Sequence, residues 1–201
     1  VGRVAALHGS HARERLAPSV GAALAEISEL DPAPPVVLCE STGVARPWPL
    51  IKALTQNKRF FLRHFIVTVD ALNLHRDFAD GRALTGESAA SDDAAMHRAA
   101  EVLVEQIAFA NVIILTKVDT IPEDTAASQV KSLQKLQPNA TIGLSAQAGI
   151  LLPQLEATAA PKVSLLEERA KEFGLTQEAS ITENVEALVP VSYTHLTLPT
   201  I

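Results

Sequence analysis

Three short polar clusters each follow directly after an apolar run of the sequence. They are ESTG (40–43), TKVD (116–119) and SAQ (145–147). Each cluster is weak evidence singly, because a Lys-x-Asp sequence in a loop is most often a solvated turn capped by the Asp. Their common position after apolar runs is more informative. Carboxylates, hydroxyls, an ammonium group and a glycine at one edge of a sheet could together bind a small polar molecule.

The elements that would position these clusters are alternating strands and helices. Apolar runs predict strands within 36–39, 64–70, 111–119 and 140–144, and helical spacing of apolar residues predicts helices within 47–56, 94–110, 126–136 and 150–157. Strands that are apolar throughout and separated by helices predict an α/β fold with a parallel sheet covered on both faces. Because such sheets bind ligands at the carboxyl ends of their strands, the three clusters are expected to share one edge.

Composition narrows the class of protein. A chain of 201 residues with 47% apolar and 20% charged content can bury one substantial core. Its net charge of −6 and its lack of a Lys/Arg-rich block argue against nucleic-acid binding, although backbone N–H groups could still bind a small anion. The single cysteine, Cys39, excludes an internal disulfide. Without an apolar run of about 20 residues or a signal-peptide pattern, we expect no membrane contact and a cytoplasmic location.

Both ends of the sequence indicate a fragment. The chain begins at Val1, within VGRVAAL, which is typical of the end of an element rather than the start of a protein. The last segment, VSYTHLTLPTI (191–201), changes character abruptly and resembles a translated sequencing adapter. The alternative is a short β-like tail. We leave these residues, His195 included, out of the functional reasoning.

Three longer segments carry a family resemblance. They are VVLCESTGVARP (36–47), FIVTVDA (65–71) and EQIAFANVIILTKVD (105–119). In order and spacing they resemble the CobW-like family of GTP-binding metallochaperones and cofactor-assembly GTPases, relatives of the nickel-insertion GTPases for hydrogenase and urease. In that family the apolar strand of the first segment ends in Glu-x-x-Gly, and the last segment ends in Asn-Lys-x-Asp. The resemblance extends over roughly residues 1–155.

The resemblance implies an architecture. It implies a doubly wound parallel sheet of the P-loop NTPase type, truncated at its N-terminus. A partial GTPase domain would occupy 1–160. The Glu/Lys-rich stretch 161–190, which contains LLEERAKEF, would be a helical linker toward a missing C-terminal domain.

For the base of GTP, the resemblance assigns Lys117 and Asp119. An ionised Asp offers two acceptor oxygens, which match the N1–H and N2–H groups of guanine but not the N1 acceptor of adenine. Lys117 would lay its aliphatic stem along the base. Thr116 replaces the usual Asn, a position that braces neighbouring loops. Ser145 and Ala146 match the position where related GTPases present a backbone N–H to guanine O6.

For the phosphates, the resemblance assigns Glu40 and Gly43. Glu40 would hold a water bound to Mg²⁺, and Gly43 would let its backbone N–H approach the γ-phosphate. Alternatively, Ser41 or Thr42 caps the next helix while Glu40 is solvated. Arg46 stands where the family has Asp, and it is either near the γ-phosphate or an exposed residue at a helix start. Asp70 receives no catalytic role, because an Asp at a strand end is often a turn cap.

Two family motifs are missing from the sequence. No G-x-x-x-x-G-K-[ST] phosphate loop is present, which a truncation upstream would explain. The family's Cys-x-Cys-Cys metal motif is absent from residues 1–11, where only His8 and His11 could bind a metal. Cys39 is expected to be buried in a strand and to pack rather than bind metal.

The leading hypothesis is therefore a GTPase that uses GTP and Mg²⁺ to deliver zinc or another transition metal, as cargo, to a client metalloenzyme. The fragment alone is expected to be inactive. One alternative is an ATP-dependent P-loop enzyme of the partitioning or synthetase type. Asp119 argues against it, because its acceptor oxygens would meet the N1 acceptor of adenine. The other is a non-catalytic α/β binding module, such as a receiver-like module using Asp70. It would need an acidic cluster near its first strand, and none is seen.

Overall fold

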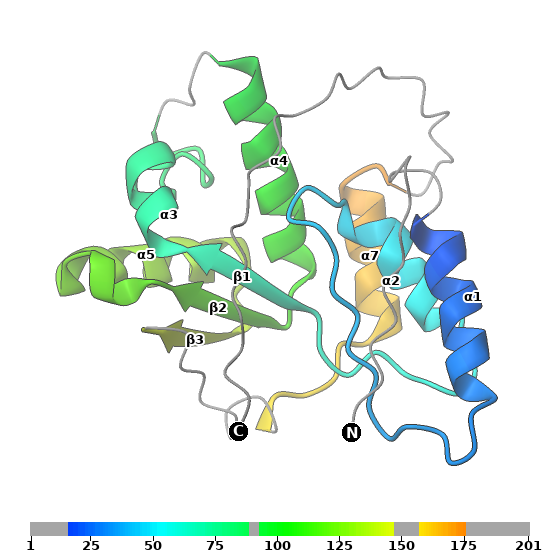
Figure 1. Ribbon diagram of the computed structural model, residues 1–201. Coiled ribbons are helices and arrows are strands. Elements are labelled where there is room, and N and C mark those ends of the chain that lie inside the picture. Colours follow the sequence, from blue (N-terminus) through cyan, green and yellow to red (C-terminus); the bar gives the residue numbers. More distant parts are fainter. Residues whose placement is uncertain (1–15, 89–92, 147–156, 176–201) are drawn as a thin grey trace.

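Figure 1 shows the computed structural model of the chain, in which helices pack around a small sheet. The structure describes residues 16–88, 93–146 and 157–175. The helices are α1 (Leu16–Ser28), α2 (Pro47–Thr55), α3 (Ala71–Asp77), α4 (Ala94–Phe109), α5 (Glu123–Leu136) and α7 (Val163–Glu172), and the strands are β1 (Ile66–Asp70), β2 (Val112–Thr116) and β3 (Thr141–Ser145). Within these described ranges, no helix combines the length and the apolar character that a membrane crossing requires.

The three strands form a parallel sheet in the order β1-β2-β3. Helices α3 and α4 lie in the connection from β1 to β2, and α5 lies in the connection from β2 to β3. In the register of the sheet, Asp70 is opposite Thr116, and Thr116 is opposite Ser145. The predicted α/β class and parallel sheet are confirmed, and the carboxyl ends of all three strands lie at one edge.

The core is centred on β2. Its first four residues, VIIL, are buried, as expected of a central strand that is covered on both faces. Strand β1 differs, because Val67 and Val69 are buried while Ile66 and Thr68 are exposed. The prediction that both faces of the sheet are covered is therefore correct for β2 and wrong for β1. Among the described residues, β1 has a neighbouring strand on one side alone.

Most predicted elements occur where the sequence indicates them. The structure confirms the strands at β1 and β3 and the helices at α2 and α4 within one or two residues of their predicted ends, and it confirms β2, which ends three residues earlier than predicted, at Thr116. Helix α5 begins three residues earlier than predicted, at Glu123, and two acidic residues in its first turn favour that start. Helix α7 contains most of the helical stretch LLEERAKEF. The helix predicted within 150–157 lies almost entirely outside the described residues.

The strand predicted at 36–39 is absent, and the structure has an irregular segment there. A strand needs a neighbour for its backbone hydrogen bonds, and none of β1, β2 and β3 pairs with this segment. Val36 and Leu38 are 79% and 87% exposed, and only Val37 packs partly against the cluster of apolar residues between α1 and α2. Cys39 is exposed, so the prediction that it is buried in a strand is also wrong.

Helices α1, α2 and α7 form a separate group beyond β1, at the right of Figure 1. Val20 and Leu24 of α1 pack with Leu50 of α2. On the other side of α2, Ile51 packs with Phe109 of α4 and Leu166 of α7. Helix α4 contacts the irregular segment 36–46 through Glu105 and Gln106, which bond to Arg46 and to the carbonyls of Gly43 and Ala45.

Candidate functional site

The carboxyl ends of β2 and β3 bring two of the three polar clusters together. Thr116 and Ser145 are register partners at the last position of their strands. The backbone after β2 turns through a short 3-10 helix, η2 (Val118–Thr120), which contains Asp119. As predicted, the TKVD and SAQ clusters therefore start side by side at one edge of the sheet.

Lys117 adopts a left-handed backbone conformation, with φ 58° and ψ 31°. This conformation is unfavourable for a residue with a Cβ, so it requires local support. Thr120 provides it, because its backbone N–H and its hydroxyl both donate to the Lys117 carbonyl, at 3.0 and 2.7 Å. The sharp turn directs the Lys117 side chain back across the end of β1, where its ammonium group lies 2.5 Å from Oδ2 of Asp70.

Asp70 ends β1 and is the N-cap of α3. Its Oδ1 accepts hydrogen bonds from the backbone N–H groups of Leu72 and Asn73, at 2.9 and 3.2 Å. Partial burial raises the pKa of the Asp70 carboxyl, but the hydrogen bond from Lys117, the two backbone donors and the Lys117 charge together lower it below its ordinary value. The residue is a cap, as the sequence indicates, and also half of an ion pair that the sequence does not reveal.

The other residues at this edge differ in exposure. The Thr116 hydroxyl donates to the carbonyl of Val69 at 3.1 Å, which joins the ends of β2 and β1. Asp119 is exposed. Ser145 is buried, whereas Ala146 is exposed, so a contact from this position to a ligand would come from the main chain near Ala146 rather than from the serine side chain.

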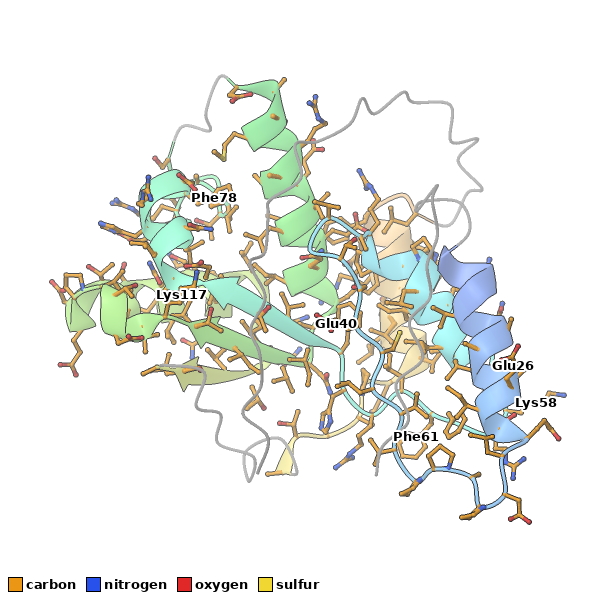
Figure 2. The ribbon with its side chains drawn as sticks, in the orientation of Figure 1. Glu26, Glu40, Lys58, Phe61, Phe78 and Lys117 are labelled. Atoms are coloured by element: carbon orange, nitrogen blue, oxygen red, sulfur yellow. The ribbon has the colours of Figure 1, made fainter. Side chains whose placement is uncertain are left out.

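The ESTG cluster lies elsewhere. Figure 2 shows Lys117 at the end of the sheet near α3 and Glu40 on the far side of β1, toward α2. Glu40 is exposed. The structure thus does not bring Glu40 together with Lys117. The prediction that all three clusters share one edge is therefore wrong for the ESTG cluster (Figure 2), because the segment that contains it pairs with none of the three strands.

Gly43 lies in a turn that does not itself require glycine. Its φ is outside the left-handed region, and a Cβ added to it would meet no atom of the described residues within 4 Å. The turn is closed by a hydrogen bond of 3.0 Å from the Ala45 N–H to the Thr42 carbonyl. Ser41 and Thr42 do not cap α2, because its N-cap is Arg46 and no side chain caps that helix end. The capping half of that alternative is therefore wrong, whereas the exposure of Glu40 agrees with its other half.

Helix α4 holds this turn through two consecutive residues. The Gln106 side-chain amide donates to the carbonyls of Gly43 and Ala45, at 3.0 and 2.9 Å. Next to it, Glu105 Oε2 accepts from Arg46 Nη1 at 2.9 Å. Arg46, at the start of α2, is therefore paired with a carboxylate of α4. Sequence reasoning missed both α4 residues, although they lie within the EQIA stretch that carried the family resemblance.

Glu105 is an ionisable residue in a buried position. It is 2% exposed, and its second oxygen, Oε1, has no hydrogen-bond partner among the residues that the structure describes. Burial raises the pKa of its carboxyl above the ordinary value, and the charge and hydrogen bond of Arg46 offset this effect only in part. Holding Glu105 ionised is therefore costly to the fold.

The metal-binding predictions receive little support from side-chain geometry. Within 16–88, 93–146 and 157–175 there is no group of three or more His, Cys, Asp or Glu residues that could hold a metal ion. His8 and His11 lie outside the described residues. Glu40 is a single exposed carboxylate, and the resemblance assigns it to a water of the Mg²⁺ shell rather than to the ion itself.

Comparison with known proteins gives one family. The model of the family described as CobW/HypB/UreG, nucleotide-binding domain, matches residues 12–143, well over half of the chain. The match includes Glu40, Gly43 and the whole TKVD cluster, and it ends just before Ser145. It begins after His8 and His11. No solved structure matches the chain.

Proposed function

Because this chain belongs to the CobW/HypB/UreG family through its nucleotide-binding domain, we propose that it binds GTP, with Lys117 and Asp119 reading guanine. One observation carries the proposal. Thr116 and Ser145 are register partners at the carboxyl edge of the sheet, and the left-handed turn at Lys117 leaves Asp119 exposed at that edge.

Guanine fits this edge chemically. The Asp119 carboxylate accepts from the N1–H and N2–H groups of the base, and the backbone near Ala146 donates to O6. The aliphatic stem of Lys117 covers one face of the base while its ammonium group is paired with Asp70. Adenine, with an acceptor at N1, would leave the carboxylate without a donor. Such a site discriminates between the bases by on the order of 10⁴.

Glu40 and Gly43 form the phosphate side of the proposed site. Glu40 holds a water molecule of the Mg²⁺ shell, and the backbone N–H of Gly43 donates to the γ-phosphate. The open space around the Gly43 Cα supports this role, because neither backbone conformation nor packing explains the glycine. When bound, Mg²⁺ neutralises phosphate charge. Gln106 holds the Gly43 carbonyl and so orients the peptide that follows it.

Hydrolysis of GTP also requires a phosphate-binding loop, and this sequence contains no G-x-x-x-x-G-K-[ST]. We propose that the intact protein carries the loop upstream of Val1 and couples hydrolysis to delivery of a transition metal, such as zinc, to a client metalloenzyme. A receiver-like module built on Asp70 is disfavoured, because both carboxylate oxygens of Asp70 are already bound.

The test is nucleotide selectivity in the protein expressed from its gene start. GDP and ADP, each with Mg²⁺, are titrated into the protein by calorimetry, so that binding is measured without hydrolysis. The proposal expects GDP to bind at least about a hundredfold more tightly than ADP. Equal affinity for the two nucleotides, or absence of GDP binding, would overturn it.

A further inference from the structure

We propose that Asp70 is a positioning residue for guanine recognition, acting through Lys117, whose side chain it holds in place beside the base. This inference rests on the proposed function, because it presumes that Lys117 contacts the base. It goes beyond that function by giving a role in ligand binding to a residue 47 positions away from Lys117 in the sequence.

The backbone brings the two residues together. Asp70 is the last residue of β1 and is in register with Thr116, the last residue of β2. Lys117 follows Thr116 directly, and its left-handed φ of 58° turns the chain at that point. The Lys117 ammonium group then lies 2.5 Å from Asp70 Oδ2, although the Lys117 side chain is 58% exposed. The side chain is thus more than half exposed although its tip is held by Asp70.

The Asp70 carboxylate is itself fixed. Its other oxygen, Oδ1, accepts from the backbone N–H groups of Leu72 and Asn73 in the first turn of α3. That turn is anchored, because Ala71 is buried and its carbonyl accepts from the buried Gln129 side chain at 2.9 Å. Because Oδ1 is bound to a rigid helix turn, the orientation of the Asp70 carboxylate is fixed, and with it the position of the Oδ2 atom that binds Lys117.

This arrangement prepares the site for its ligand. A lysine side chain has many rotamers, and ordering it when a ligand binds opposes binding. Asp70 selects one of these conformations before the ligand arrives. The stem then runs from the end of β2 toward Asp70 at the end of β1, and a base bound at this edge can stack on it without first ordering it.

The competing explanation is that Asp70 only caps α3 and that the ion pair is an incidental surface contact, which is often worth little. Two substitutions separate these roles. Asp70→Asn and Asp70→Ser both keep a residue that caps helices well, but both remove the charge that holds Lys117. Asp93→Asn makes the same change at the N-cap of α4, where Asp93 accepts from the Ala95 N–H at 2.8 Å, and serves as the matched control.

The experiment is a double-mutant cycle on GDP affinity in the full-length protein, with Asp70→Asn and Lys117→Met alone and combined. We expect Asp70→Asn and Asp70→Ser each to weaken GDP binding about three- to tenfold. In the Lys117→Met background the same changes should weaken it less than about twofold, because Asp70 acts through Lys117. Asp93→Asn should leave the affinity within about twofold of the parent.

Two results would overturn the positioning role alone: unchanged GDP affinity in both Asp70 variants, or an equal loss with and without Lys117, which would assign the effect to the α3 cap. If instead Lys117→Met leaves GDP affinity unchanged, the proposed contact between Lys117 and the base is wrong, and the positioning role is wrong with it. The cycle therefore distinguishes failure of this inference from failure of the proposed function.

Discussion

The Arg46 guanidinium lies 2.9 Å from the carboxylate of Glu105, joining the start of α2 to the buried face of α4. Glu105 is the buried partner and Arg46 the half-exposed one. Since burial of a carboxylate opposes its ionisation, this contact holds the turn after Glu40 at a cost in stability. It also makes the fold sensitive to pH.

Glu105→Gln should remove part of that sensitivity. The folded-state pKa of Glu105 is raised above its ordinary 4.5, so the folded protein binds this proton more tightly than the unfolded chain. Its contribution to stability is complete below pH 4.5 and is lost as the pH rises through the folded pKa. Thermal unfolding measured from about pH 5 to about pH 8 should therefore show a smaller loss of stability with rising pH in the variant.

The control is Glu167→Gln, an exposed glutamate on α7. It should reproduce the pH profile of the parent chain. If Glu105→Gln also reproduces the parent profile, the raised pKa of Glu105 is contradicted.

Gln106→Ala should release the turn that contains Gly43. The variant loses two hydrogen bonds, to the Gly43 and Ala45 carbonyls, and we expect the unfolding free energy to fall by about 1 to 2 kcal/mol in urea denaturation. Gln134→Ala, on the exposed face of α5, should change it by less than about 0.5 kcal/mol. Equal effects of the two substitutions would mean that Gln106 does not hold the turn.

Substituting alanine at two glycines should have different effects on stability. Gly81→Ala should cost more than about 1 kcal/mol of stability, because φ is +85° and the new Cβ would lie 2.7 Å from Ser132 Cβ. Gly43→Ala should leave stability within about 0.5 kcal/mol of the parent, because the site has room. In the full-length protein, however, its methyl group should obstruct the γ-phosphate and slow GTP hydrolysis by roughly tenfold or more. Undiminished hydrolysis would exclude Gly43 from the phosphate site.

Leu38→Ser tests the absence of a strand at 36–39. Because Leu38 is 87% exposed, the substitution should change the unfolding free energy of this 201-residue chain by less than about 0.5 kcal/mol. Leu50→Ala, at a buried position of α2, should cost about 2 to 4 kcal/mol in the same denaturant titration. A comparable loss in both variants would indicate that the segment is buried after all.

The accuracy of the predicted fold depended on which strands have a neighbouring strand, and the pattern of apolar residues does not reveal this. The apolar runs at 36–39 and 112–115 are equally typical of strands, yet only the second forms one. Periodicity reports which side chains are apolar and not whether a neighbouring strand is present for the backbone. The same limit explains β1, whose sequence does not show that Ile66 and Thr68 are exposed.

For the candidate site, the expected parallel order of strands and helices was enough to predict that the TKVD and SAQ clusters share an edge of the sheet. Parallel strands joined by helices require that Thr116 and Ser145 share an edge. The contacts of Gln106 could not be predicted, because a glutamine on an amphipathic helix is most often solvated. The same holds for the ion pair between Asp70 and Lys117, since it depends on a left-handed turn at a lysine.

The central claim is that Asp119 reads guanine, and a change of base preference tests it most directly. Affinities of the full-length protein for GDP and XDP are measured for the parent, for Asp119→Asn and for the control Asp124→Asn, an exposed position in the first turn of α5. The amide of Asn donates to the carbonyl that replaces the guanine amino group in xanthine. We predict that Asp119→Asn changes the GDP-to-XDP affinity ratio by at least about a hundredfold in favour of XDP, while Asp124→Asn leaves the ratio unchanged. An unchanged ratio in Asp119→Asn would contradict base recognition by this residue.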